Sequence, residues 1–66
     1  MVDWAKVEKL RKDKGWSQER AAVESGLGGG RQQWNNLVNG RQEGITLATL
    51  EKIAQALGVK AKSLIK

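Results

Sequence analysis

Residues 17–40 read SQERAAVESGLGGGRQQWNNLVNG, and this stretch determines the fold class. Ser17 is a favourable N-cap, because its hydroxyl can accept a hydrogen bond from a free amide of the first helical turn. The residues after it predict a helix over 18–25, with Ala21-Ala22 as a small face for close packing. Gly26 ends this helix, because glycine readily takes the left-handed conformation of a C-terminal cap.

A second short helix is predicted from Gly30 or Arg31 to Val38. Asn39-Gly40 follows it as a strong stop signal. Two short helices joined through a turn that contains glycine form a helix-turn-helix. Residues 17–40 therefore predict this motif.

Further helices flank the motif. The chain before Gly15 predicts a helix over 4–14 that Asp3 caps, and the chain before Gly58 predicts one that Thr46 caps. A last helical turn over 61–65 is weakly capped. Helical spacing places these residues on the core: Trp4, Val7, Leu10, Trp34, Leu37, Leu47, Leu50, Ile53, Ala54, Leu57, Leu64 and Ile65. The fold class is all-α, with four to five helices in a single domain over 1–66.

The composition of the chain favours some classes of function and argues against others. The 66 residues include 12 Lys and Arg against 7 Asp and Glu, and this formal net charge of +5 favours a polyanionic partner. The chain has no His or Cys and no carboxylates paired on one face, so we expect no enzyme activity, no metal and no cofactor. No apolar run is long enough to cross a membrane. We expect a cytoplasmic protein with no membrane partner.

The predicted helix over 30–38 is rich in amides. Its polar residues, with the one that follows it, are Arg31, Gln32, Gln33, Asn35, Asn36 and Asn39. Asn is a poor helix former, so this composition calls for a reason. Arg matches the edge of guanine and Asn or Gln that of adenine in the major groove, and no acidic residue occurs from 31 to 42. The alternative is a polar surface helix without a partner.

Three segments carry a resemblance to a known family: residues 10–19 (LRKDKGWSQE), 34–40 (WNNLVNG) and 47–59 (LATLEKIAQALGV). They resemble the repressor/Cro type of helix-turn-helix domain, the XRE family, and the likeness extends from about Val7 to Ile65. The resemblance implies a lambda-repressor-like fold. It also implies a transcriptional regulator of bacterial or phage type, a repressor, that binds double-stranded DNA sequence-specifically.

The resemblance implies roles for individual residues as well. Gln18, directly after the N-cap, would bind a phosphate and brace the recognition helix. The implied base contacts are Arg31, Gln32, Asn35 and Asn36. The implied DNA backbone contacts are Gln18, Gln33, Asn39 and Arg41. The implied core positions are Leu10, Ala22, Leu27, Trp34, Leu37, Leu47, Leu50, Ile53 and Leu57.

The sequence departs from the family pattern in two places. The turn over 27–31 is longer than the family's tight turn, and its three glycines make it flexible, so the start and direction of the recognition helix stay open. Trp16 and Trp34 replace residues that are usually aliphatic. We expect Trp34 in the core.

Family members usually bind as dimers to half-sites about 34 Å apart. The resemblance therefore implies a homodimer on DNA that blocks or recruits RNA polymerase. The last helical turn and the loop over 42–45, with Ile45 exposed, are the predicted dimer contacts. One alternative is a protein-interaction module such as an antitoxin, which would expose aliphatic residues on the helix over 30–38. Another is RNA binding, for which a rigid helix is poorly suited.

Overall fold

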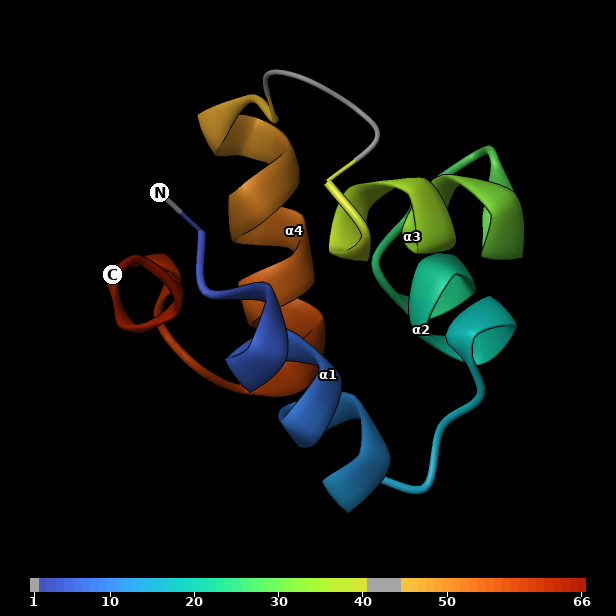
Figure 1. Cartoon of the computed structure of the whole chain (residues 1–66), viewed down its shortest axis with the longest axis horizontal. Coiled ribbons are helices and arrows are strands. Elements are labelled where there is room, and N and C mark those ends of the chain that lie inside the picture. The colour runs from blue at the N-terminus through green and yellow to red at the C-terminus, as the bar shows by residue number, and fades with distance from the viewer. Residues whose placement is uncertain (1, 41–44) are drawn as a thin grey trace.

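The computed structural model describes residues 2–40 and 45–66 and consists of helices (Figure 1). They are α1 (Trp4–Asp13), α2 (Gln18–Glu24), α3 (Gly30–Val38), α4 (Leu47–Leu57) and a 3₁₀ turn, η1 (Ala61–Leu64). Within the described ranges there is no strand, and a single antiparallel bridge joins Val2 to Ile65. The predicted all-α class is confirmed, and each predicted helix forms to within one residue at its ends.

The helices begin where short polar side chains accept amide hydrogen bonds. The three predicted N-caps are confirmed, and each accepts from the amide three residues further on: Asp3 from Lys6 at 3.1 Å, Ser17 from Arg20 at 3.0 Å and Thr46 from Thr49 at 3.1 Å. The helices end at glycines with positive φ, as predicted: Gly15, Gly26, Gly40 and Gly58.

The end of α4 shows why glycine is required there. The amide of Val59 donates to the carbonyl of Ala54 at 3.0 Å, and the amide of Gly58 donates to that of Gln55 at 3.2 Å. This pair of bonds is the Schellman motif, and it requires the left-handed backbone of Gly58, whose φ is 77°. Val59 is half-buried against the core.

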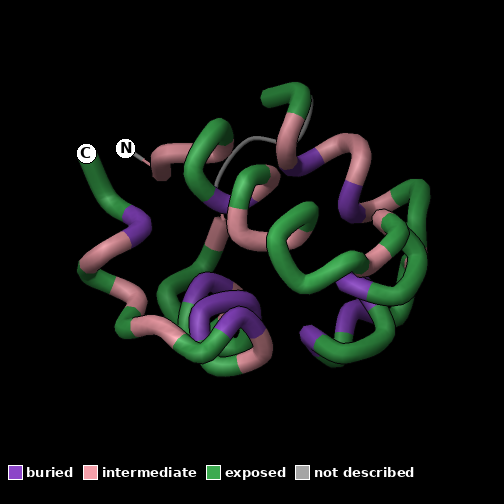
Figure 2. Tube along the Cα trace, turned by 90° about the horizontal axis from the view of Figure 1, so that it is seen from below, coloured by how far each residue is buried: buried purple, intermediate pink, exposed green. Residues whose placement is uncertain are grey.

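One apolar core joins all the helices (Figure 2). Trp34 and Ile53 are fully buried and are its largest central side chains together with Leu37. The core is completed by Val7, Ala21, Ala22, Leu27, Leu50, Ala54, Leu57 and Leu64. Trp4 and Leu10 are half-buried against it, so α1 contributes mainly through Val7.

Three predicted positions need correction. Leu47 was predicted in the core but is 63% exposed, because it lies in the first turn of α4, which projects past the other helices in Figure 1. Ile65 was also predicted in the core and is 46% exposed. The 3₁₀ turn ends at Leu64 and the chain is extended at Ile65, so Ile65 no longer follows the helical spacing that placed it on the core.

Ile45 was predicted to be exposed and is half-buried against the core. It directly precedes the N-cap Thr46, the position from which an apolar side chain can pack on the first turns of its helix. The other residues of the predicted dimer loop, 42–44, lie outside the described residues.

The two ends of the described chain lie side by side (Figure 1). The amide of Asp3 donates to the carbonyl of Leu64 at 2.7 Å, and the ammonium group of Lys6 donates to that of Ser63 at 2.9 Å. No side chain caps η1, as predicted. Contacts with the start of α1 hold this last turn in place instead.

The turn between α2 and α3 spans residues 25–29, and α3 begins at Gly30 with a φ of +60°. A Cβ at position 30 would meet no atom within 4 Å, so only the backbone conformation requires glycine there. We expect Gly30→Ala to lower the free energy of unfolding by about 1–2 kcal/mol, the cost of a left-handed conformation for an L-residue.

Gly28→Ala is the matched control, because Gly28 has the same open surroundings without a positive φ. This change is expected to be neutral or to stabilise by about 0.4–1 kcal/mol through the unfolded chain. Urea unfolding of both variants tests the difference. Equal stability of the two variants would mean that Gly30 does not hold this backbone in solution.

Candidate nucleic-acid interface

Helix α3 packs against α2 and has two different sides (Figure 1). Trp34 and Leu37 are buried beneath it. Arg31 and Gln32 are exposed, as is Asn39 directly after the helix. Gln33, Asn35 and Asn36 are half-buried at the margins. The predicted base-contact residues therefore share one helix, and its two most exposed side chains are an Arg and a Gln.

The amides of α3 pair along the helix. The Gln32 amide nitrogen donates to the Asn36 amide oxygen at 3.2 Å, and Asn39 donates to Asn35 in the same way at 3.1 Å. Each pair is four residues apart, the spacing that brings side chains together on one helix face. Every amide in these pairs keeps further donors or acceptors. The two amide pairs thus present both hydrogen-bond donors and acceptors, as the edges of base pairs do.

Gln33 braces the start of α3. Its side-chain oxygen accepts from the amide of Gly29 at 2.8 Å, where no side-chain cap comes from Gly29 itself. A Cβ at position 29 would lie 2.7 Å from the Cβ of Gln33, so glycine allows this close approach. Gln33 was predicted to contact the DNA backbone. Its oxygen is occupied within the chain, and its amide NH₂ remains for that role.

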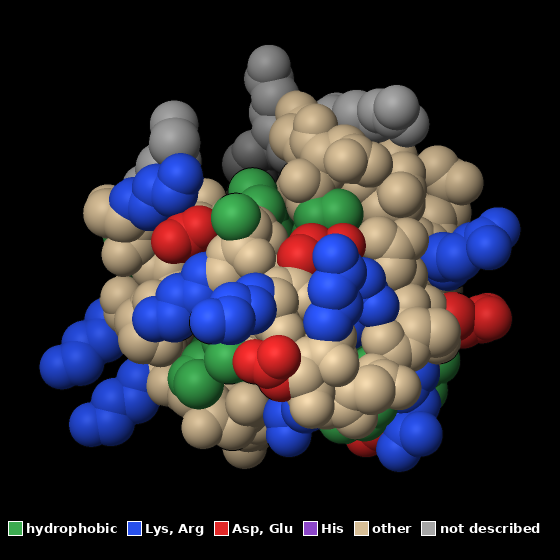
Figure 3. Space-filling model, turned by 60° about the horizontal axis from the view of Figure 1, so that its bottom comes forward, with side chains coloured by type: hydrophobic (Ala, Val, Ile, Leu, Met, Phe, Trp, Pro, Cys, Tyr) green, Lys and Arg blue, Asp and Glu red, His purple; other side chains and the backbone are tan. Residues whose placement is uncertain are grey.

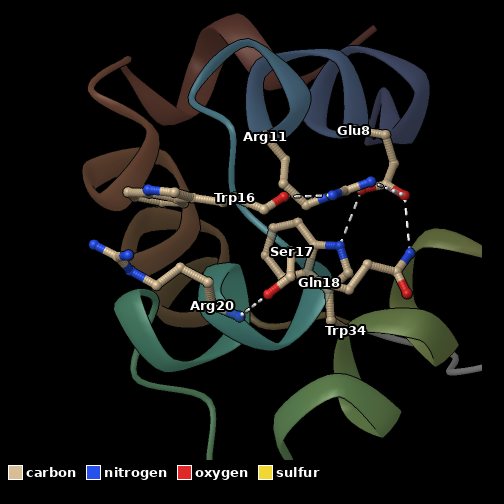
Figure 4. Close-up of polar contacts among 7 residues, drawn as sticks. All are labelled: Glu8, Arg11, Trp16, Ser17, Gln18, Arg20 and Trp34. Atoms are coloured by element: carbon tan, nitrogen blue, oxygen red, sulfur yellow. Dashed lines mark hydrogen bonds and ion pairs between the residues drawn. The ribbon is translucent and has the colours of Figure 1, made fainter.

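Glu8 of α1 connects three elements (Figure 4). Its carboxylate accepts from the amide of Gln18 at 3.0 Å and from the indole N–H of Trp34 at 3.1 Å, and it forms an ion pair with Arg11. Arg11 also donates to the carbonyl of Trp16 at 2.6 Å. Gln18, predicted to brace the recognition helix, is therefore joined to α3 through Glu8 and Trp34.

The ionisation of Glu8 follows from this network. Burial raises the pKa of its carboxyl group, but hydrogen bonds from Arg11, Trp34 and Gln18, with the charge of Arg11, outweigh burial and bring the pKa below 4.5. A group whose pKa is lowered by folding stabilises the fold above its unfolded pKa. This stability is lost as the pH falls through the folded pKa.

We therefore expect the wild-type chain to lose stability progressively as the pH drops below 4.5, the ordinary value for Glu8. Glu8→Gln should be less stable at pH 7, and its stability should depend less on pH in the acidic range. Urea unfolding of both chains between pH 7 and pH 3 measures this. Parallel curves over that range would show that Glu8 does not carry the linkage.

Trp16 lies in the turn between α1 and α2, directly before the N-cap Ser17 (Figure 4). The ammonium of Lys14 is 5.1 Å and the guanidinium carbon of Arg20 is 5.6 Å from the centre of its ring. Both distances are typical of cation–π contacts. The half-buried indole thus holds two cations near the start of α2. The sequence showed that Trp16 departs from the family pattern, but it did not predict its contacts with Lys14 and Arg20.

The basic residues of one face of the described chain are spread over it (Figure 3). On the face drawn in Figure 3, Lys and Arg side chains project at several separate places, with acidic side chains among them. Arg31 is the one charged residue of α3. The distinctive feature of this helix is therefore its hydrogen-bonding groups rather than a high charge.

The described residues offer neither a metal site nor a membrane span. No group of three or more His, Cys, Asp or Glu among them could hold a metal ion. None of the helices is long and apolar enough to cross a membrane.

The structure brings most of the predicted site residues together. Arg31, Gln32, Gln33, Asn35, Asn36 and Asn39 all lie on α3 or directly after it, and Gln18 is linked to its underside. Arg41 lies outside the described residues. Sequence reasoning missed Glu8 and Arg11. Their three-residue spacing on α1 was the available signal, together with the need of a buried Trp34 for an acceptor.

Comparison with known proteins identifies a family for the chain. A family model described as a helix-turn-helix domain matches residues 5–66. No curated protein and no solved structure matches the chain. The match covers α2, α3, α4 and η1 in full and α1 from its second residue, and it confirms the resemblance that the three sequence segments indicated.

Proposed function

The chain belongs to the helix-turn-helix domain family, and we propose that it binds double-stranded DNA sequence-specifically and represses transcription. Family membership itself indicates DNA binding and transcription regulation. Beyond this, we propose which helix reads the DNA, which residues contact it, that the protein binds as a dimer and that it represses transcription.

The observation that carries the proposal is the two-sided character of α3. Its buried side anchors it through Trp34 and Leu37, and its exposed side presents Arg31 and Gln32. The major groove of DNA, about 12 Å wide, admits one α-helix, and there Arg pairs with guanine and Gln or Asn with adenine. We assign base contacts to Arg31, Gln32, Asn35 and Asn36.

Contacts to the DNA backbone come from around this helix. Gln18 is the first residue of α2, and the side-chain N–H that is not bonded to Glu8 can donate to a phosphate. Asn39 is exposed directly after α3, and Gln33 keeps its NH₂ group. We assign backbone contacts to Gln18, Gln33, Asn39 and Arg41. The net charge of +5 supplies affinity through release of counterions from the phosphates.

The size of the domain supports binding as a dimer. Its Cα atoms extend 24 Å along the longest axis, less than the separation of about 34 Å between half-sites one helical turn apart. One copy carries one α3 and can therefore read only one half-site, so the second half-site needs a second copy. Two half-sites are needed for the affinity of a typical operator. We propose a homodimer on DNA that represses by occluding RNA polymerase, in the cytoplasm where DNA is accessible.

The protein-interaction alternative has less support. An antitoxin-like surface on α3 needs exposed aliphatic side chains, and the exposed residues of this helix are Arg31 and Gln32. Val23, on α2, is 64% exposed and could contribute to a contact with a protein partner. Such a contact is compatible with DNA binding through α3.

Fluorescence anisotropy with three labelled nucleic acids of one sequence tests the proposal at two salt concentrations. Double-stranded DNA should bind most tightly, with single-stranded DNA and double-stranded RNA well behind. The logarithm of the association constant for DNA should fall linearly with the logarithm of the salt concentration, with a slope of about −0.9 for each phosphate neutralised. Equal binding of duplex RNA, or no binding of duplex DNA, would reject the proposal.

A further inference from the structure

The carboxylate of Glu8 joins the two elements that carry the proposed DNA contacts. It lies on α1, away from the exposed side of α3, and accepts from Gln18 at 3.0 Å and from Trp34 at 3.1 Å (Figure 4). Its partners thus come from the first residue of α2 and from the middle of α3.

The bond to Trp34 fixes α3 against α1. An indole N–H can only donate, and a buried donor without an acceptor is unfavourable. Trp34 is fully buried, and Glu8 accepts its one polar hydrogen. The indole therefore holds a defined position beneath the helix that carries Arg31 and Gln32.

The bond to Gln18 fixes the direction of an amide. A glutamine amide has a donating NH₂ group on one side and an accepting oxygen on the other. A carboxylate only accepts, so the NH₂ group of Gln18 must face Glu8, as it does at 3.0 Å. One N–H is used in this bond and the second can donate to another acceptor. A DNA phosphate is such an acceptor.

Arg11 completes the arrangement. It pairs with Glu8 from the same helix and donates to the carbonyl of Trp16 in the turn before α2. The positive charge offsets that of the carboxylate, which would otherwise repel a phosphate near Gln18. Of the groups in contact with Glu8, Arg11 is the charged one, since Gln18 and Trp34 carry no charge.

We infer that Glu8 is a positioning residue for DNA binding: it orients the Gln18 amide toward a backbone phosphate and holds α3 at a matching position through Trp34. This inference rests on the proposed function, because it concerns how the chain presents groups to DNA. Glu8 itself touches no DNA.

A double-mutant cycle on DNA affinity tests the inference. Glu8→Gln replaces the carboxylate by an amide that can donate as well as accept, so it no longer dictates the direction of Gln18. It should weaken binding to a DNA site selected by the wild-type chain about threefold to tenfold, the effect of one hydrogen bond. With Gln18→Met already present, the same change should cost less than about twofold, because coupled residues are not additive.

Glu24→Gln is the matched control for charge. Glu24 forms an exposed ion pair with Arg20 on α2, and its loss changes the net charge by the same amount as Glu8→Gln. A more positive chain binds a polyanion at least as well, so Glu24→Gln should match or exceed the wild type. Opposite effects of the two variants support the inference, whereas equal effects would overturn it.

A measurement on the wild-type chain covers the case in which Glu8→Gln fails to fold. The side-chain amide protons of Gln18, followed by NMR, should shift with the titration of the Glu8 carboxyl group on acidification. Amide signals that ignore this titration would overturn the inference without any variant. Failure of the wild type to bind DNA would instead reject the proposed function, so the two failures are distinguishable.

Discussion

Replacing Trp34 with alanine is expected to unfold most of the protein at room temperature. The side chain is fully buried at the centre of the core, and loss of a buried Trp costs about 3–5 kcal/mol. A domain of this size rarely has more than about 3–5 kcal/mol of stability in total. Circular dichroism should show little helix in Trp34→Ala, and urea should unfold what remains without a clear transition.

Two matched variants interpret this result. Trp4→Ala removes the same side chain from a half-buried position on α1, and this variant should stay folded but unfold at a lower urea concentration than the wild type. Trp34→Phe keeps an aromatic ring but cannot donate to Glu8, so it should lie between Trp34→Ala and the wild type. A cooperative Trp34→Ala domain that melts near the wild type would show that the core is not centred on this residue.

Replacing Arg31 with alanine is expected to have the largest effect on DNA binding. Arg31 is exposed on the first turn of α3 and is the one charged residue of that helix. Loss of a bidentate contact to guanine costs about 1–3 kcal/mol, a decrease in affinity of roughly 5- to 150-fold. The variant should also tolerate changes at one base position of the site. Anisotropy titrations with the selected site and its single-base variants measure both effects.

Lys62→Ala controls for charge in this experiment. Lys62 is exposed on η1, and its removal lowers the net charge by the same amount as removal of Arg31. Lys62→Ala should weaken binding to all DNA sequences alike, and by much less than Arg31→Ala weakens binding to the selected site. Screening by salt limits the effect of a distant exposed charge. If Lys62→Ala reproduces the loss seen with Arg31→Ala, then Arg31 acts only through its charge.

The helices could be predicted from the sequence because local signals determine them. Ser17, Thr46 and Gly58 act through hydrogen bonds and backbone angles within a few residues, and each was confirmed. Burial at the ends of elements could not be predicted in this way. Leu47 and Ile65 fit the helical spacing of the core, yet their exposure depends on where the other helices end and where the backbone becomes extended.

The site was predictable to a similar extent. The residue types of α3 indicated its exposed amides and arginine, since a buried side and a polar side follow from spacing alone. The Glu8–Arg11 pair has a local signal in its three-residue spacing, but the bonds from Glu8 to Gln18 and Trp34 were not predictable, because they join residues separated by 10 and 26 positions. Such contacts depend on how the helices pack. The brace between Gln33 and Gly29 likewise depends on the backbone of the long turn.

Selection from a random pool of duplex DNA shows whether α3 reads DNA sequence. The chain is titrated into the pool at two salt concentrations, and the retained DNA is sequenced for the wild type and for Gln32→Ala. We expect one enriched motif, a palindrome with half-sites about one helical turn apart, that persists at the higher salt. Gln32→Ala should lose preference at particular positions. Retention of DNA without a common motif, and loss of that retention at higher salt, would show that α3 does not read sequence and that charge alone is the basis of DNA binding.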